Sequence, residues 1–144
     1  MLALVAAMGG AAGASKASVD PRRCSLEQKV ALVRALSTAF NAGNDLAVHR
    51  LVAAEPAFQW FSAPGSSRDA RRLGPEAYDR STLREYVRQR HRHRERWTNV
   101  EFGGELRLPL TLTREADDYR RSRVRGKVDA ICTGRSARII AWSL

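Results

Sequence analysis

Few carboxylate and tyrosine side chains in this sequence could act together in acid–base chemistry. Asp129 lies in a β-rich stretch, and Tyr86 lies in a stretch with helical periodicity. A carboxylate with a tuned pKa beside a tyrosine donor can move a proton next to a carbonyl group. Asp129 and Tyr86 are therefore side chains whose types could do this chemistry. Because Asp129 has the opposite parity to the apolar Val128 and Ala130, the alternative places it in solvent or beside an arginine.

Several aromatic side chains could line a pocket for a small molecule. Aromatic walls are typical of such pockets, which are concave and mostly apolar. The alternative is that these rings only pack in the core, and the two interpretations overlap where a pocket is continuous with a core. The candidate ligand-binding residues are Phe40, Trp60, Tyr86, Trp97 and Trp142.

The sequence contains no motif typical of a metal or cofactor site. His91 and His93 are two positions apart, and on a helix this spacing points the two rings away from each other, so they are poorly placed to hold one metal ion. The sequence has no P-loop, no dinucleotide-binding glycine motif, no Cys-x-x-Cys and no Gly-x-Ser-x-Gly. We expect neither a metal nor a cofactor.

The first 24 residues differ in composition from the rest of the chain. The run from Leu2 to Ala14 is apolar and small, and it is too short to span a bilayer as a helix. The sequence ASKAS, which begins at Ala14, is similar to a signal-peptidase site. No positive charge precedes the run, so the segment is either signal-peptide-like or a disordered tail. We expect a secreted or periplasmic protein in the first case and a cytoplasmic one in the second.

The two cysteines of the chain are Cys24 and Cys132. In an exported protein they could form a disulfide, and closing so long a loop stabilises a fold by about 4–5 kcal/mol in the chain-entropy model. The alternative is two unpaired thiols, one of them packed in a strand. Both remain open at this point because export is itself undecided.

Positive charge is concentrated in the sequence RQRHRHRERW, within a chain whose formal net charge is +10. Apolar residues at helical spacing before and within this stretch predict an amphipathic helix over residues 79–96. Its basic outer face is predicted to be solvated and partly compensated by acidic neighbours, with Glu95 beside Arg92. The alternative is a stripe that binds a polyanion. The arginines at four-residue spacing on this face are Arg88, Arg92 and Arg96.

Two further helices are predicted near the start of the folded part. Ser25 and Gln28 form a capping box before an apolar stripe at helical spacing. Gly43 suits the end of that helix, and Asn44 can cap the next one. The sequence therefore predicts a long helix followed at once by a short one.

Strands are predicted from alternation and from β-rich composition. The first lies at residues 57–62 and is followed by a connection over residues 63–78 that is long enough for a lid. Several further strands are predicted in the part of the chain after the third helix. Turns between them are expected at Gly103-Gly104, residues 113–122 and residues 133–136. Helices gathered on one face of an antiparallel sheet make an α+β domain.

The ordered series of these segments resembles the nuclear transport factor 2-like superfamily and, within it, the SnoaL-like and ketosteroid-isomerase-like proteins. VRALSTAFNAGNDLAVHRLVA is similar to the family's first two helices, FQWF to its first strand, LREYVRQRH to its third helix, and LTLTREADD with GKVDAICTGRSARIIAWSL to its closing hairpins. The resemblance covers residues 25–144 as a single domain. It implies a cone, in which a strongly bent antiparallel sheet wraps around the long N-terminal helix, with two further helices and a pocket at the open end.

Function is not decided by such a fold, because the superfamily includes isomerases, cyclases, dehydratases and binders without catalysis. Its isomerases use a pocket carboxylate base and an oxyanion-stabilising tyrosine. The predicted first strand has no carboxylate, so the resemblance leaves Asp129 and Tyr86 as the candidate catalytic residues. We expect a domain that binds a small, largely apolar ligand in the cone without catalysis. The alternatives are an isomerase, cyclase or dehydratase, and an interaction module with a basic helix face for an acidic partner. The resemblance also implies a homodimer through the outer sheet face; we expect no nucleic-acid partner and no membrane span.

Overall fold

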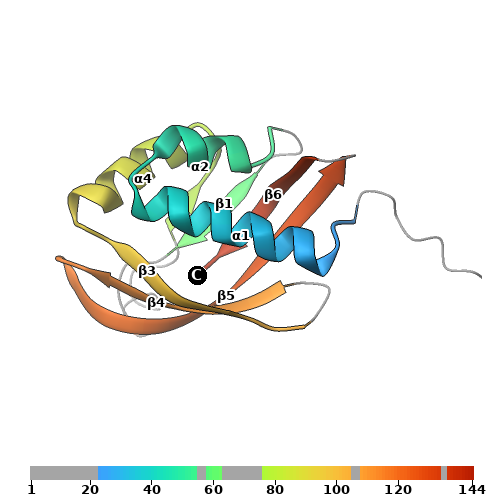
Figure 1. The fold of residues 1–144 in the computed structure, drawn as a ribbon. Helices are drawn as coiled ribbons and strands as arrows, with labels where there is room; N and C mark the ends of the chain where they lie inside the picture. Colours follow the sequence, from blue (N-terminus) through green and yellow to red (C-terminus); the bar gives the residue numbers. More distant parts are fainter. Residues whose placement is uncertain (1–22, 55–57, 63–75, 105–107, 134–135) are drawn as a thin grey trace, which may run out of the picture.

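The computed structural model describes residues 23–54, 58–62, 76–104, 108–133 and 136–144. These residues form three helices on one side of a six-stranded curved sheet (Figure 1). The helices are α1 (Leu26–Asn41), α2 (Asp45–Leu51) and α4 (Leu83–Arg92). The strands are β1 (Gln59–Ser62), β2 (Glu76–Tyr78), β3 (Arg96–Phe102), β4 (Leu108–Ala116), β5 (Tyr119–Thr133) and β6 (Ser136–Ser143). No described helix is both long and apolar enough to cross a membrane.

The strand order in the sheet is β2-β1-β6-β5-β4-β3. The hairpins β3–β4, β4–β5 and β5–β6 are antiparallel as predicted, whereas β1 runs parallel to β6. The sheet is therefore mixed, which corrects the expectation of a wholly antiparallel one. The difference arises because no hairpin links β1 to β6, so no tight turn dictates their relative direction.

Two of the loops predicted from the sequence have different bounds in the structure. The short strand β2 lies inside the predicted 63–78 connection, of which residues 63–75 fall outside the described residues, as does the N-terminal segment before residue 23. The β4–β5 hairpin has a tip of only two residues, Asp117 and Asp118, where a polar tip over residues 113–122 was predicted. The other residues of that stretch belong to β4 and β5, where Arg114 pairs with Glu95 and Arg121 lies near Glu115.

Gly126 of β5 lies very close to the backbone at the end of β6. A Cβ atom built at this position would lie 2.0 Å from the carbonyl oxygen of Ser143. Because no side chain fits there, glycine lets β6 approach β5 closely in the middle of the long strand, which Figure 1 shows as strongly curved.

Local capping interactions confirm the two predicted N-terminal helices. The Ser25 hydroxyl accepts from the backbone N–H of Gln28, and the Ser25 N–H donates to Gln28 Oε1 at 2.8 Å. Gly43 has φ +66° just after α1, and Asn44 Oδ1 accepts from the N–H of Ala47 at the start of α2. These bonds satisfy backbone groups that a helix leaves free at its ends.

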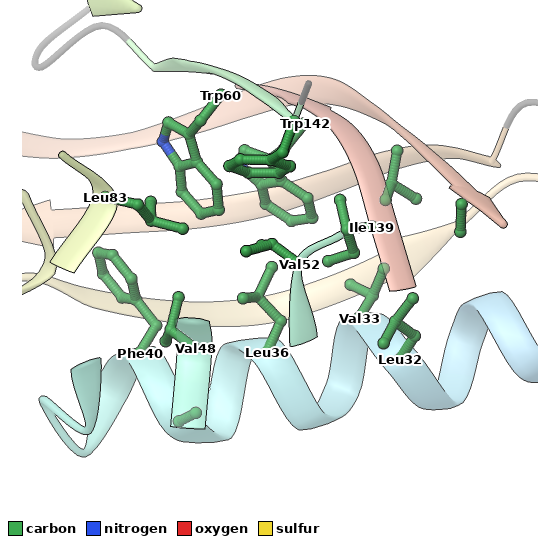
Figure 2. Packing of buried hydrophobic residues seen from close by; sticks show 14 of the residues in the cluster. Leu32, Val33, Leu36, Phe40, Val48, Val52, Trp60, Leu83, Ile139 and Trp142 are labelled. Carbon is green, nitrogen blue, oxygen red and sulfur yellow. The ribbon is translucent and has the colours of Figure 1, made fainter. Parts of the chain in front are cut away.

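The core lies between α1 and the inner face of the sheet. Leu36 and Phe40 of α1 point toward Trp60 of β1 and Trp142 of β6, with Ile139 beside them (Figure 2). Each of these side chains is at most 2% exposed. Burial of large apolar side chains on facing elements, at about 1.5–3 kcal/mol each, holds the helix against the sheet.

A disulfide joins the residues just before α1 to the C-terminal end of β5. Cys24, immediately before the capping box, forms a disulfide with Cys132, with the two Cα atoms 5.1 Å apart. An isolated bridge between Arg23 and Ile131 lies next to it. The chain before α1 is thereby fastened to the sheet.

Asp79 caps the turn that leads into α4. Its carboxylate accepts from the N–H groups of Ser81 and Thr82 and from both hydroxyls. The hydrogen bond from Ser81 is the main cause that lowers the pKa of Asp79 to about 2.

The Asp79→Ala variant should therefore show a stability defect that depends on pH. The stabilisation by the carboxylate is present above its unfolded-state pKa of about 3.9 and is lost as the pH falls through about 2. In urea unfolding followed by tryptophan fluorescence, we expect a lower midpoint than wild type at pH 7 and a difference that shrinks toward pH 2. A difference that is constant with pH would show that the charge of Asp79 is not what stabilises the turn.

Candidate functional site

Five aromatic side chains meet inside the fold and form what we call the aromatic cluster. Trp60 and Trp142 are paired on β1 and β6, and their rings stack with centroids 5.2 Å apart. Trp97 of β3 stacks on Trp142 at 5.4 Å and on Phe40 at 3.9 Å, and Trp60 lies 5.9 Å from Tyr86. The five residues proposed from the sequence as ligand-binding are thus brought together from β1, β3, β6, α1 and α4. All five are at most 2% exposed.

Polar groups lie along the edges of the aromatic cluster. Tyr86 Oη donates to Ser62 Oγ at 2.9 Å in a buried position. Burial, together with the charge of Glu95, raises the pKa of Tyr86 to about 12, so the phenol stays neutral and remains a donor. The indole N–H groups of Trp60 and Trp142 are buried and have no acceptor among the described residues.

An ion-pair network formed by the buried Arg90, Glu95 and Arg114 and the partly exposed Asp118 adjoins the cluster. Glu95 Oε2 accepts from Arg90 Nε at 2.5 Å, and its Oε1 accepts from Arg114 Nε and from Trp97 Nε1, both at 2.8 Å. The two terminal nitrogens of Arg90 bind both oxygens of Asp118, at 2.7 and 2.8 Å. The network therefore ties the end of α4 to the β4–β5 hairpin and, through the Trp97 indole, to the aromatic cluster.

The electrostatics of this network keep Glu95 ionised. Burial acts to raise the pKa of Glu95, but the positive charge and hydrogen bond of Arg114 outweigh it, and the pKa lies below its ordinary value. The guanidinium carbons of Arg90 and Arg114 lie 5.2 and 5.4 Å from the ring centroid of Tyr119. Burial and the nearby carboxylate raise the pKa of Tyr119. With both oxygens engaged and a lowered pKa, Glu95 is poorly suited to take up a proton from a ligand.

Several solved structures are similar to the fold of this chain. One similar structure is that of SalBIII, an epoxide hydrolase/cyclase-like enzyme with a role in pyran ring formation in the polyether salinomycin. It is 14% identical to this chain with a TM-score of 0.52, and the match covers 81% of this chain and 89% of that one. A protein of unknown function with a cystatin-like fold from Nostoc punctiforme is 12% identical with a TM-score of 0.52, over 84% and 92%. An NTF2-like protein of unknown function from Cytophaga hutchinsonii is 11% identical with a TM-score of 0.50, over 78% and 83%.

The chain has the nuclear transport factor 2-like fold. No protein-family model matches its sequence, and no curated protein matches it significantly. At 11–14% identity the likeness to solved structures extends to the fold alone, so the site has to be judged from its own residues.

Within this nuclear transport factor 2-like fold, Asp129 and Tyr86 lie on opposite faces of the sheet. Asp129 alternates on β5 with the buried Val128 and Ala130, so it faces outward. It lines an outer hollow of about 250 Å³, and its Oδ1 accepts from the N–H of Ala130. Tyr86 is buried and faces the cone interior, so the structure does not bring these two side chains together. Among the described residues no three His, Cys, Asp or Glu side chains gather in a way that could hold a metal ion.

The basic face of α4 is largely neutralised by acidic side chains. Arg84 lies 2.6 Å and Arg88 3.1 Å from Asp45 of α2. Glu85 lies 3.1 Å from both Arg88 and Arg92. The prediction of a solvated, partly compensated face is confirmed for this part of the helix.

The second half of RQRHRHRERW departs from the prediction. The helix ends at Arg92, and Arg96 already begins β3, so Arg96 does not share the helical face. Glu95 is buried between Arg90 and Arg114 and does not pair with Arg92. Local sequence spacing does not reveal this network, because Glu95 and its partner Arg114 on β4 are far apart in the chain. A usable signal existed: Arg90 stands on the apolar face of the helix, where a charged residue needs a buried partner.

Proposed function

We propose that the protein binds a small, largely apolar ligand inside the cone, without catalysis. The observation that carries this proposal is the pair of buried indole N–H groups of Trp60 and Trp142, which lack acceptors among the described residues. A buried indole N–H ordinarily has a partner, and leaving such a donor unpaired costs about 1–3 kcal/mol. A flat ligand with one or two acceptor atoms, stacked on these rings, would satisfy both donors.

The polar groups at the cluster favour recognition over proton transfer. The Ser62 hydroxyl, which accepts from Tyr86, can donate its own hydrogen to a ligand oxygen, and the high pKa of Tyr86 keeps its proton in place. The buried carboxylate of Glu95 is engaged by three donors, and Asp129 faces outward. A general base is therefore not evident among the described residues that face the aromatic cluster.

An isomerase, cyclase or dehydratase remains the second candidate. It is favoured by one structural neighbour described as an epoxide hydrolase/cyclase-like enzyme and by a neutral tyrosine inside the cone. Such an activity would need a proton acceptor in addition to Tyr86. Retention of an unmodified ligand would favour binding, and release of a chemically altered one would favour the enzyme.

We also propose a homodimer through the apolar end of the outer sheet face. Ile131 of β5 and Ala141 of β6 lie there next to buried residues and are only partly covered. Sedimentation analysis should give twice the chain mass. A monomer at micromolar concentration would contradict this arrangement.

Native mass spectrometry of protein purified from its own host tests the ligand proposal. We expect an added mass that is lost on denaturation, and a retained fraction that falls in Trp60→Phe and Trp142→Phe. Loss of one hydrogen bond of about 1 kcal/mol corresponds to roughly fivefold weaker binding. Trp97→Phe is the matched control, because its indole N–H is already bound to Glu95. A native mass equal to that of the protein alone would contradict the proposed role of the two indole N–H groups. So would an equal fall of the retained ligand fraction in all three variants.

A further inference from the structure

Four basic side chains stand in one row on the outer face of β5, and we call this row the basic stripe. Its members are Arg121, Arg123, Arg125 and Lys127, all exposed. Because they occupy alternate positions of a strand, neighbours in the row are about 6.8 Å apart. They point away from the core, since the intervening Val124 packs against it.

Positive charge on this face is less compensated than on the helix. Arg125 and Lys127 have no carboxylate within 4.0 Å among the described residues. Arg123 pairs with Glu101 at 2.6 Å, and Arg121 lies 3.9 Å from Glu115, with all four of these side chains at least 45% exposed. Such exposed pairs contribute at most about 1 kcal/mol, so a stronger anion can displace them. The sheet, and not α4, therefore carries the available cationic row.

The surroundings of the row can hold an extended chain. A hollow of about 400 Å³ is lined by Thr111, Arg125 and Lys127, among others. A second hollow places the partly exposed ring of Phe61 beside Lys127. Proteins that bind single-stranded nucleic acid combine such features: a row of positive charges, a hydroxyl group next to the row, and an aromatic ring at one end of it.

We propose that the basic stripe binds the sugar-phosphate backbone of a single-stranded nucleic acid without base specificity. Regularly spaced guanidinium groups suit successive phosphates, because arginine binds phosphate oxygens with two parallel hydrogen bonds. A flat anionic membrane is a poorer fit, because Glu101 and Glu115 lie on the same face and a continuous anionic surface would meet them. The formal net charge of +10 did not by itself predict a nucleic-acid partner, because a net charge does not show that four basic side chains stand in one row.

Anisotropy of a fluorescein-labelled oligothymidylate of twenty nucleotides, with the full disulfide-bonded chain, tests this proposal. Four phosphate contacts on a single strand predict a slope of about −2.8 for log K against log salt concentration, between about 50 and 200 mM. The Arg125→Ala/Lys127→Ala variant should lower the slope by about 1.4 and weaken binding at least tenfold at about 50 mM salt. Both side chains are exposed, so folding should be preserved.

The matched control is Arg34→Ala/Arg50→Ala, which removes the same charge from exposed positions on α1 and α2 that have no described ion pair. This variant should retain nearly the wild-type affinity. An equal loss in both variants, or no oligonucleotide binding at about 50 mM salt, would overturn the proposal. So would binding of poly-L-glutamate, or of phosphatidylcholine vesicles with about 30% phosphatidylserine, as tightly as the oligonucleotide, because the stripe would then recognise a different class of polyanion.

Discussion

Glu95→Gln should lower the free energy of unfolding by about 3–5 kcal/mol. Removing one partner from a buried ion pair leaves uncompensated buried charge, and this is the usual size of the loss. Here a neutral glutamine would face both Arg90 and Arg114, whose side chains are 5% and 1% exposed. A domain is stable by only about 5–15 kcal/mol, so urea unfolding monitored by tryptophan fluorescence should detect the change easily.

Glu85→Gln is the matched control for this experiment. Glu85 also pairs with two arginines, Arg88 and Arg92, at 3.1 Å each, but its side chain is 61% exposed. Exposed pairs contribute little because water and salt screen them, so we expect a much smaller effect. Equal losses in Glu85→Gln and Glu95→Gln would contradict the view that burial makes the Glu95 network important.

The pH dependence of the same variant gives a second measurement. Burial raises the pKa of Glu95, but the pairing with Arg114 and Arg90 more than compensates, so the folded-state pKa lies below its ordinary value. The resulting stabilisation is present above the unfolded-state pKa of about 4.3 and is lost as the pH falls through the lower folded-state pKa. The difference between wild type and Glu95→Gln should therefore shrink below about pH 4.

Reduction of the Cys24–Cys132 disulfide should destabilise the fold by about 4–5 kcal/mol. The two cysteines are 108 positions apart, and the chain-entropy model gives its largest effects for such long loops, although the mechanism is disputed. The bond also fastens the start of α1 to the end of β5. The urea midpoint of wild-type protein should fall sharply when dithiothreitol is present during unfolding.

The Cys24→Ala/Cys132→Ala variant separates the covalent bond from the packing of the two side chains. It should unfold near the midpoint of reduced wild type and should not respond to dithiothreitol. A wild-type midpoint that is the same with and without reductant would show that the bond does not stabilise the folded protein.

The sequence by itself determined the features that depend on neighbours along the chain. The capping box of Ser25 and Gln28 and the glycine at position 43 located the ends of α1, because each satisfies backbone groups within a few residues. Helical spacing and strand alternation showed which faces are buried. The order of these predicted helices and strands resembles the nuclear transport factor 2-like superfamily, and this resemblance was enough to predict the fold. The sequence also predicted that Trp60 and Trp142 lie together inside it.

Only the tertiary structure decided which distant groups face one another. It paired Glu95 with Arg114, placed Asp129 on the outer face, joined Cys24 to Cys132 and set β1 parallel to β6. The sequence pattern specifies that a face is buried, but not what is packed against it. The partner of a buried charge depends on how strands that are far apart in the chain are brought into register, and no local spacing records that register.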